Sequence, residues 1–240
     1  MGGKINKIKM KNKQSVLITG SSKGLGKYLA LTFVKNDYNI ILHGRDKKDL
    51  EIVREQIGKK VNVDVVKGDL KSDQTIKDLY KTAKQRNISI LINNASLHHL
   101  KLPLEELTNQ QIEDTILTNL ISPIKLTKKV YSFFLEKKQG TIININSALG
   151  LEPKDLRSVY CATKWGLRGF ADSLRLEAEK NNIRIVDIYP SRIKTIPKYQ
   201  DFGMKPENVA QEIYGVYKNT KKNGLIIDDR PEGKVKIKYI

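Results

Sequence analysis

The sequence contains a single cysteine, Cys161, and only three histidines among its 240 residues. A lone cysteine excludes an internal disulfide and favours a reducing compartment. Two of the histidines, His98 and His99, are adjacent, so their side chains point apart on any extended segment and do not make a metal-ligand pair. We therefore expect neither a disulfide framework nor a metal centre.

Long apolar runs are also lacking, and none approaches the roughly 20 residues that a membrane-spanning helix needs. The first residues are basic and do not have the apolar core of a secretory signal. These absences predict a cytoplasmic protein without a membrane partner. Residues 1–12 are expected to form a mobile basic extension, and 13–240 a single domain, because no linker, repeat or low-complexity segment interrupts them.

Acidic residues are scarce beside basic ones, 26 against 44, which gives a formal net charge of +18. Such a charge can attract nucleic acid or an anionic surface. The lysines are spread along the whole chain, however, and no clustered basic helix or nucleic-acid recognition motif accompanies them. The sequence therefore predicts no nucleic-acid partner. Solvated helix faces account for most of the excess, and attraction of an anionic substrate is the alternative.

Short apolar runs alternate with segments of helical spacing along the chain. The strand-like runs lie near 15–19, 38–43, 61–66, 88–93, 140–146, 183–189 and 224–228. Long helices are expected near 109–137 and 158–181. This alternation predicts an α/β fold, a doubly wound parallel sheet of about seven strands flanked by helices. The alternating tail at 234–240 is expected to add an edge strand or to pair with a neighbouring subunit.

An apolar run, a glycine-rich turn and a helical pattern follow one another from Val16 to Gly26 and beyond. Strand, turn and helix in this order form the dinucleotide-binding βα unit of Rossmann-type folds. Gly20 permits the tight turn, Gly24 lets the backbone approach the pyrophosphate, and Gly26 allows close packing of helix on strand. Backbone N–H groups at the helix start bind phosphate. The expected contacts are Gly20, Ser22, Lys23, Gly24, Leu25 and Gly26.

The second strand-like run ends in Leu42-His-Gly-Arg-Asp46, and its end indicates which nicotinamide dinucleotide is bound. An acidic residue there would bond the ribose 2′-hydroxyl of NAD and repel the additional phosphate of NADP. Here Gly44 takes that position and Arg45 follows, while Lys23 supplies a second cation from the glycine turn. A guanidinium binds phosphate with paired, charge-assisted hydrogen bonds. The sequence therefore predicts NADP(H), and Asp46 is expected to cap the next helix.

Tyr160 and Lys164 are four residues apart in a helical pattern and form the most informative pair in the chain. Side chains at this spacing lie on one face of a helix, one turn apart. An ammonium so placed stabilises a phenolate, so a tyrosine with a reference pKa near ~10 becomes a usable acid or base near neutral pH. Ser147, thirteen residues before Tyr160, supplies a hydroxyl that can orient a carbonyl oxygen.

Taken together, these motifs closely resemble the short-chain dehydrogenase/reductase family. The matching segments are Thr19–Gly26, Gly68–Leu70, Asn93–Ser96, Asn119, Ser147, Tyr160 with Lys164, and Pro190–Thr195, in the family's order and covering roughly 14–230. Two residues depart from the pattern, because Ser96 and Ser191 stand where the family usually has glycine. Both are small, and Ser96 is expected to add a hydroxyl near the nicotinamide without abolishing catalysis.

The resemblance implies reduction of a ketone to a secondary alcohol by hydride transfer from NADPH. In this scheme Tyr160 donates the proton, Ser147 orients the carbonyl, and Lys164 lowers the tyrosine pKa and holds the nicotinamide ribose. Asn119 is expected to anchor a water that relays protons to Lys164. The resemblance also implies cofactor contacts by Asp69 (adenine), Leu70, Asn93 and Ala95 (adenosine ribose), Pro190, Ile193 and Thr195 (nicotinamide carboxamide).

The substrate is expected to be a small carbonyl compound. Candidate residues of a basic rim are His98, His99, Lys101, Lys154, Arg157, Arg192, Lys194 and Lys198. Such a rim would fit anionic substrates, either 3-oxoacyl thioesters or nucleotide-linked keto sugars. The general resemblance is to 3-oxoacyl-thioester reductases, although the C-terminal part lacks their Asp-Gly-Gly turn.

Two alternatives are an alcohol dehydrogenase acting in the oxidative direction and a non-catalytic dinucleotide-binding sensor or scaffold. The family also implies self-association, as a dimer or tetramer, through the long helices near 109–137 and 158–181.

Overall fold

The computed structural model describes residues 13–98, 101–195, 201–219, 223–230 and 236–239. The expected N-terminal extension lies outside these residues, as do His99 and Lys198 of the expected basic rim. Within the described part, no helix combines the length and the apolar character that crossing a bilayer requires.

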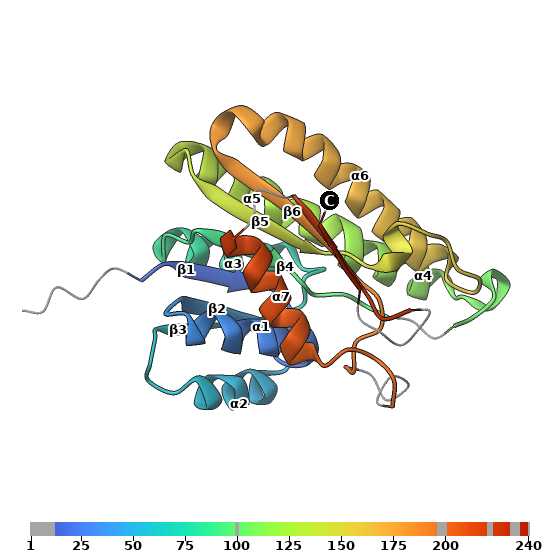
Figure 1. Ribbon diagram of the computed structural model, residues 1–240, viewed down its shortest axis with the longest axis horizontal. Helices are drawn as coiled ribbons and strands as arrows, with labels where there is room; N and C mark the ends of the chain where they lie inside the picture. Colours follow the sequence, from blue (N-terminus) through green and yellow to red (C-terminus); the bar gives the residue numbers. More distant parts are fainter. Residues whose placement is uncertain (1–12, 99–100, 196–200, 220–222, 231–235, 240) are drawn as a thin grey trace, which may run out of the picture.

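The described strands form one sheet of eight, in the order β3-β2-β1-β4-β5-β6-β7-β8 (Figure 1). The strands are β1 (Ser15–Ile18), β2 (Asn39–Gly44), β3 (Val63–Lys67), β4 (Ile90–Asn93), β5 (Gly140–Ile145), β6 (Ile183–Pro190), β7 (Gly224–Asp228) and β8 (Lys236–Tyr239). The first seven are parallel, which confirms the predicted strands and their arrangement. The strand order reverses beside β1, where β2 lies on one side and β4 on the other. Ligands of doubly wound folds bind at such a switch point.

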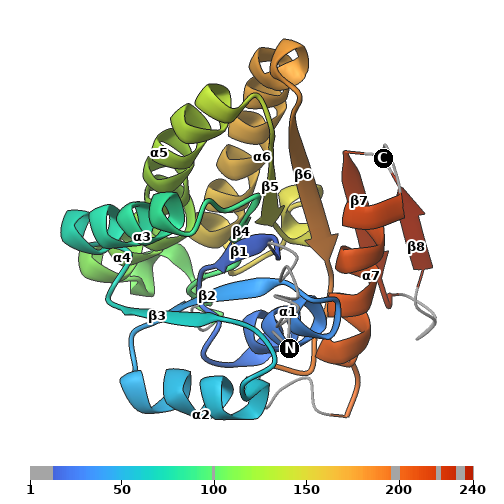
Figure 2. The same cartoon turned by 90° about the vertical axis from the view of Figure 1, so that its left-hand side faces the viewer.

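The C-terminal tail adds the eighth strand, which pairs antiparallel with β7 in the register Leu225 to Tyr239. Of the two predicted arrangements, an edge strand on the chain's own sheet is therefore the one formed. All four residues of β8 are exposed, and Figure 2 shows the strand at the outer edge beside β7.

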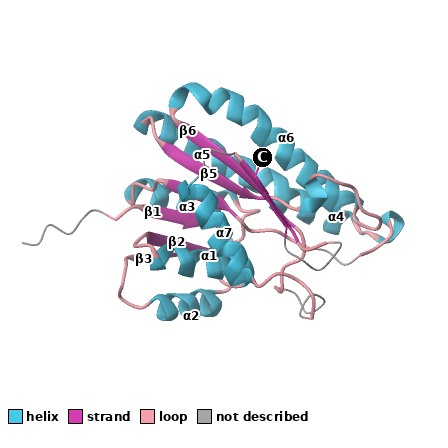
Figure 3. Cartoon of the chain, viewed as in Figure 1, coloured by secondary structure: helices cyan, strands magenta, loops and turns pink. Residues whose placement is uncertain are grey.

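Helices cover both faces of the sheet, and the alternation with strands is visible in Figure 3. The helices are α1 (Gly24–Lys35), α2 (Lys47–Ile57), α3 (Asp73–Gln85), α4 (Asn109–Ile116), α5 (Ser122–Lys137), α6 (Ser158–Ala178) and α7 (Pro206–Asn219). One apolar cluster joins α1, α2 and α7 to the sheet, and a second joins α3, α5 and α6 to its other face (Figure 2). Successive residues of β1 serve both clusters, because Val16 and Ile18 face one and Leu17 the other.

The predicted helix over 109–137 is interrupted, which corrects the expectation of one continuous helix. Between α4 and α5 the segment Leu117–Ile121 is a π-helix. Asn119 lies in the middle of this segment and is 1% exposed. Apolar spacing does not reveal one extra residue in a turn, and such π segments are frequent at functional sites.

Two other helix ends follow from their sequences. The Asp46 carboxylate accepts hydrogen bonds from the backbone N–H groups of Lys48 (2.7 Å) and Asp49 (3.3 Å), which confirms the predicted cap of α2. The predicted helix over 158–181 is α6 followed by a short 3₁₀ turn, Glu179–Asn181.

Candidate active site

The glycine-rich turn after β1 is held by side chains from two neighbouring strands. Gly20 and Gly24 adopt positive φ angles of 64° and 56°, a region that glycine enters without strain. The amide of Asn94, just past β4, donates to the carbonyl oxygens of Thr19 (2.9 Å) and Gly20 (3.0 Å). The Asn94 side chain therefore holds the glycine-rich turn in place.

His43 of β2 supports the same turn from the other side. Its Nδ1 accepts a hydrogen bond from the backbone N–H of Gly20 (3.2 Å), and its Nε2 lies 3.2 Å from the carbonyl oxygen of Gly68. The imidazole is therefore neutral, with its proton on Nε2 donated to Gly68. Burial lowers the pKa of His43 to about 4, against the raising effects of the Gly68 bond and the Asp69 charge. His43 thus links the glycine turn to the loop that carries Asp69.

A cleft opens between the glycine turn and the loop after β6. Its volume is about 620 Å³, within the range typical of ligand sites. The lining includes Ser22, Lys23, Gly24, Lys27, Lys194 and Thr195. A Cβ added to Gly24 would lie 3.4 Å from the Thr195 side chain, so the two predicted cofactor-binding segments face each other closely. Leu25 and Gly26 lie at the start of α1 and are buried.

The loop after β6 is fixed by contacts at its base. Ile193 forms a β-bridge with Met204, and the Thr195 N–H donates to the Ile193 carbonyl oxygen (2.7 Å). Arg192, which was expected to belong to a basic rim, donates to Asp229 Oδ1 at 3.1 Å, so its charge is paired with that carboxylate. Pro190, the last residue of β6, is buried.

The predicted adenosine-binding residues lie at the ends of adjacent strands. Arg45 directly follows β2 and is exposed, and Lys23 is exposed on the glycine turn. Asp69 follows β3, and its carboxylate accepts the Lys71 backbone N–H at 2.9 Å. Since β2 and β3 are paired to their last residues, these groups share one edge of the sheet.

Tyr160 is on the first turn of α6 and is 6% exposed. The ring of His98 lies 5.1 Å from the Tyr160 ring. Burial raises the pKa of Tyr160 to about 12, while the neighbouring hydroxyls of Ser147 and Ser96 act in the opposite direction. The Nζ atom of Lys164 lies 5.6 Å from the centre of the Tyr160 ring. Tyr160 and Lys164 thus lie one turn apart on α6 and are both buried, while their catalytic roles with Ser147 stay a prediction.

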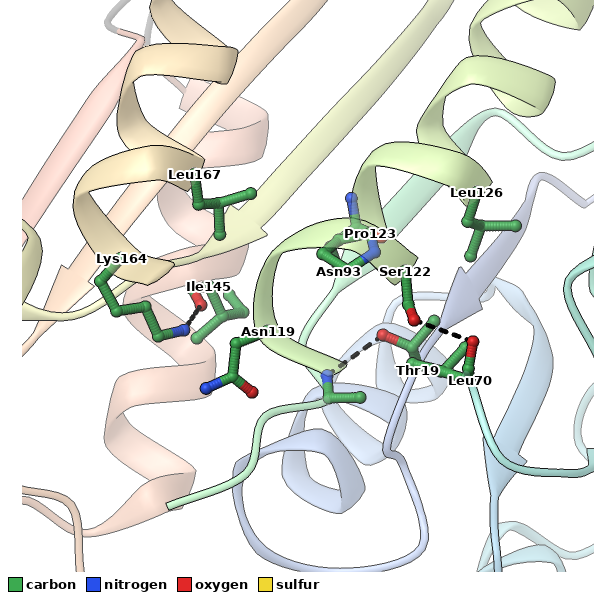
Figure 4. Close-up of a pocket in the computed structure, with 11 residues that line it drawn as sticks. Thr19, Leu70, Asn93, Asn119, Ser122, Pro123, Leu126, Ile145, Lys164 and Leu167 are labelled. Atoms are coloured by element: carbon green, nitrogen blue, oxygen red, sulfur yellow. Dashed lines mark hydrogen bonds between the residues drawn. The ribbon is translucent and has the colours of Figure 1, made fainter. Parts of the chain in front are cut away.

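Lys164 is 2% exposed and points toward the sheet, where its Nζ donates to the carbonyl oxygen of Ile145 at 3.1 Å (Figure 4). Burial lowers its pKa to about 8. A narrow cavity of about 10 Å³, the size of a single water, lies beside it. Predicted site residues that line this cavity are Leu70, Asn93, Ala95, Asn119 and Lys164.

Asn119 uses its side chain to hold the loop after β4. Its Oδ1 accepts from the Leu97 N–H (2.7 Å) and the Ser96 hydroxyl (3.2 Å), and its Nδ2 donates to the Leu97 carbonyl oxygen (3.0 Å). The side chain therefore positions residues 96 and 97 opposite Tyr160. Anchoring of a water for Lys164 stays a prediction.

The Asn93 side chain makes contacts inside the protein, while the expected ribose contact stays a prediction. Its Nδ2 donates to Thr127 Oγ1 and Asn144 Oδ1, both at 3.0 Å, and its Oδ1 is buried without a hydrogen-bond partner in the structure. Asn144 in turn donates to Asp187 (3.1 Å), which binds Arg175 at 2.6 Å. These polar residues form a ladder across β4, β5 and β6 beneath the site.

The model of the family described as short chain dehydrogenase matches residues 14–201. The chain belongs to this family. The NADP-dependent 3-hydroxy acid dehydrogenase YdfG of Salmonella typhi is 32% identical over 180 residues, covering 74% of this chain and 72% of the relative. The NADP-dependent 3-hydroxy acid dehydrogenase of Schizosaccharomyces pombe is 30% identical over 219 residues, covering 87% and 81%.

Solved structures agree with this assignment. The bulky-bulky ketone specific alcohol dehydrogenase from Comamonas testosteroni superposes with a TM-score of 0.81 at 26% identity, covering 90% of this chain and 86% of that one. The alcohol dehydrogenase from Thermococcus sibiricus, complexed with 5-hydroxy-NADP, has a TM-score of 0.84 at 20% identity, over 92% and 99%, and shares the fold. This short-chain dehydrogenase is an NAD(P)-dependent oxidoreductase of the alcohol dehydrogenase and carbonyl reductase type.

Sequence reasoning missed two features of this dehydrogenase. One is His43, whose only signal is a polar residue inside the apolar run of β2. The other is the pair of Asp187 and Arg175, where Asp187 similarly interrupts the apolar strand β6. In both cases a titratable side chain within a buried strand is the sign of a specific partner.

Proposed function

We propose that this dehydrogenase reduces a ketone to a secondary alcohol with NADPH, and that Tyr160 is the proton donor. The observation that carries the proposal is the position of the Tyr160 hydroxyl. Ser147 follows β5 at the carboxyl edge of the sheet and lowers the pKa of Tyr160, and Lys164 lies one turn away on α6, with its Nζ atom 5.6 Å from the centre of the Tyr160 ring. When bound, the cofactor supplies the hydride. The chain's own residues bind it, orient the carbonyl and move the proton.

The residues present fit a dinucleotide. The cleft is lined by a glycine turn at the start of α1, whose unbonded backbone N–H groups suit a pyrophosphate. The Gly24 position lacks a side chain where Thr195 approaches, so backbone can contact the phosphates directly. Arg45 and Lys23 support a preference for the 2′-phosphate of NADP(H), because both are exposed cations and no acidic residue follows β2 directly.

Ser147, Tyr160 and Lys164 have separate roles in the proposed reaction. Ser147 donates a hydrogen bond to the substrate carbonyl and fixes its orientation toward Tyr160. Tyr160 gives its hydroxyl proton to the oxygen as hydride arrives at the carbon. The burial that raises the pKa of Tyr160 keeps it protonated, as a proton donor must be, until the reaction. Lys164 stabilises the resulting phenolate, and its lowered pKa suits it to return the proton.

We propose an anionic carbonyl substrate, with 3-oxo acids and 3-oxoacyl thioesters as the first class to test. The relatives from Salmonella typhi and Schizosaccharomyces pombe carry the name 3-hydroxy acid dehydrogenase. In this chain the positive charge of Arg157 acts on Tyr160 and lowers its pKa, so a cation stands near the proton donor. A carboxylate or phosphate on the substrate would be attracted to the same charge.

NADPH consumption by purified protein tests the proposal. The ketone panel contains a 3-oxo acid, an acetoacetyl thioester, a nucleotide-linked keto sugar and simple diketones, and NADP+ reduction with a 3-hydroxy acid tests the oxidative direction. Tyr160→Phe is expected to lose turnover while NADPH binding is retained. Turnover that persists in this variant would overturn the assignment of Tyr160. NADPH binding without turnover of any substrate would instead favour the sensor or scaffold alternative.

We also propose that the dehydrogenase self-associates through α6 and the α4–α5 region. Trp165 and Leu176 on α6 are 46% and 75% exposed. They are eleven residues apart, which is about three helical turns, so they share one face. Sedimentation velocity should show an oligomer for the parent protein and a smaller species for Trp165→Glu. A monomeric parent would refute this interface.

A further inference from the structure

Ser191, which stands where the family usually has glycine, bonds to the end of β7. Its backbone N–H donates to the Ile227 carbonyl oxygen at 2.9 Å, where the chain leaves the sheet after Pro190. The Ser191 hydroxyl accepts a hydrogen bond from the Asp229 N–H (3.0 Å) and donates to Asp229 Oδ1 (2.6 Å). A glycine at this position could make neither of these side-chain bonds.

Asp229 belongs to the C-terminal part that lacks the Asp-Gly-Gly turn, so two departures from the family pattern are in direct contact. Its side chain is 7% exposed and also pairs with Arg192, whose Nε donates to Asp229 Oδ1 at 3.1 Å. A second guanidinium nitrogen of Arg192 donates to the Asp229 carbonyl oxygen at 3.2 Å. Because a buried carboxylate is costly without such partners, Ser191 and Arg192 together form a specific site for Asp229.

The segment after Arg192 is held from its other side by Met204, which is buried. The Met204 N–H donates to the Arg192 carbonyl oxygen, and the Lys194 N–H donates to the Met204 carbonyl oxygen, both at 2.9 Å. The chain then reaches Thr195, whose side chain would lie 3.4 Å from a Cβ added to Gly24. The position of Thr195 over the glycine turn is therefore set by bonds that begin at Asp229.

We propose that Ser191 and Asp229 are positioning residues, which hold Arg192–Thr195 in the conformation that binds the nicotinamide half of NADPH. The inference rests on the proposed function, in which Ile193 and Thr195 contact the nicotinamide carboxamide. Without the bonds to Asp229, this segment would have to be ordered as the cofactor binds, and the entropy lost in ordering it would weaken binding. The adenine half is proposed to bind at the ends of β2 and β3 and does not depend on Asp229.

The two halves of the cofactor can be tested separately. The experiment measures the dissociation constants of NADPH and of 2′-phospho-ADP-ribose, which lacks the nicotinamide, by calorimetric titration of the full chain. We expect Ser191→Ala and Asp229→Ala to weaken NADPH binding roughly tenfold, as for loss of a hydrogen bond to a charged group, and to change the affinity for 2′-phospho-ADP-ribose less than about twofold. Ser191→Thr keeps the hydroxyl and should keep the parent affinity for both.

The effects of the two substitutions should not add, because Ser191 and Asp229 act through the same bonds. The double variant should bind NADPH no more weakly than Asp229→Ala alone. Asp229→Asn serves if Asp229→Ala does not fold. Its amide keeps an oxygen for the Ser191 hydroxyl but loses the charge that pairs with Arg192, so its effect on NADPH should be intermediate.

Asp64→Asn is the matched control, since it also removes a carboxylate that binds a guanidinium, that of Arg86 at 2.7 Å, and it should change neither affinity. If the parent binds NADPH but the Ser191 and Asp229 variants weaken both probes equally, or neither, the inference about this segment is wrong and the proposed function stands. A parent that binds neither probe would overturn the proposed function and this inference with it.

Discussion

Gly26 and Gly20 are in such close contact that a Cβ added to Gly26 would lie 2.2 Å from the Gly20 carbonyl oxygen. The same Cβ would lie 2.5 Å from the Asn94 Nδ2 atom, which donates to that carbonyl. The glycine turn, the start of α1 and the residue after β4 therefore meet at one point without room for a methyl group. The end of the cleft that is proposed to bind phosphate is therefore shaped by this contact.

Gly26→Ala should therefore weaken NADPH binding and lower the melting temperature, because backbone on at least one side must move. Gly215→Ala is the matched control, since a Cβ at Gly215 on α7 meets no atom within 4 Å. Alanine there should be neutral or stabilising by about 0.5–1 kcal/mol, because it favours helix. Fluorescence titration with NADPH and thermal unfolding check both variants. Equal affinities in the two would contradict the steric argument.

His43 should make the protein less stable as the pH falls. Its pKa is about 4 in the folded protein and about 6.5 when unfolded, so the unfolded chain takes up the proton first. The stability from neutral His43 is complete above about pH 6.5 and is lost progressively as the pH falls toward 4, by about 3 kcal/mol. Urea unfolding at pH 5 and 8 measures this loss. His43→Gln should be less stable than the parent at pH 8, but its unfolding free energy should fall less between pH 8 and pH 5. An equal fall in the two proteins would rule out His43 as the source of the pH dependence.

Arg175→Met should destabilise the protein by about 3 kcal/mol at pH 8, because it leaves the Asp187 carboxylate buried without its cation. Burial already raises the pKa of Asp187 to about 6, against the effect of Arg175. Losing Arg175 raises this pKa further. Because a raised folded pKa means that stability is lost as the pH rises, the deficit of the variant should shrink at pH 5. The double variant Arg175→Met/Asp187→Asn should recover much of the stability that Arg175→Met loses at pH 8. If it does not, the loss comes from the packing of the Arg175 side chain and not from the unpaired charge.

Arg45→Asp should change the cofactor preference. A carboxylate directly after β2 would repel the 2′-phosphate of NADPH and accept a hydrogen bond from the ribose of NADH. NADPH affinity should fall about tenfold or more while NADH affinity rises. Arg54→Asp makes the same charge change on α2, beyond the expected contacts, and should affect both cofactors equally. Titration at two salt concentrations distinguishes local contact from general attraction.

Local patterns predicted the glycine turn and the Tyr160–Lys164 pair, because their chemistry requires fixed spacings within one element. The parallel sheet followed from the alternation of strands and helices. The supporting role of His43 could not be predicted for a physical reason. Its partners Gly20 and Gly68 are 23 and 25 residues away in the chain, and the sequence of one strand does not show which residues lie beside it in the sheet. Likewise, the sequence did not indicate that Arg192 pairs with Asp229, which lies 37 residues later in the chain.

The prediction for Ser96 was incomplete. The departure from glycine at that position indicated a hydroxyl near the nicotinamide, which stays a prediction. Its bond to Asn119, 23 residues away, depends on the π-helical segment, which apolar spacing did not indicate. The direction of the Asn119 side chain is therefore set by the π-helical geometry of Leu117–Ile121.

That geometry makes chain length itself a determinant of the active site. Each residue of an α-helix turns the chain by about 100°. Deleting one residue from Leu117–Ile121 would let the π segment rewind as ordinary helix, because a π turn holds about one residue more than an α turn, so α4 and α5 would keep their relative orientation. The backbone at Asn119 would nevertheless shift, and its hold on the loop at Ser96 and Leu97 would be lost. The site therefore constrains the number of residues between α4 and α5, and not only their identities.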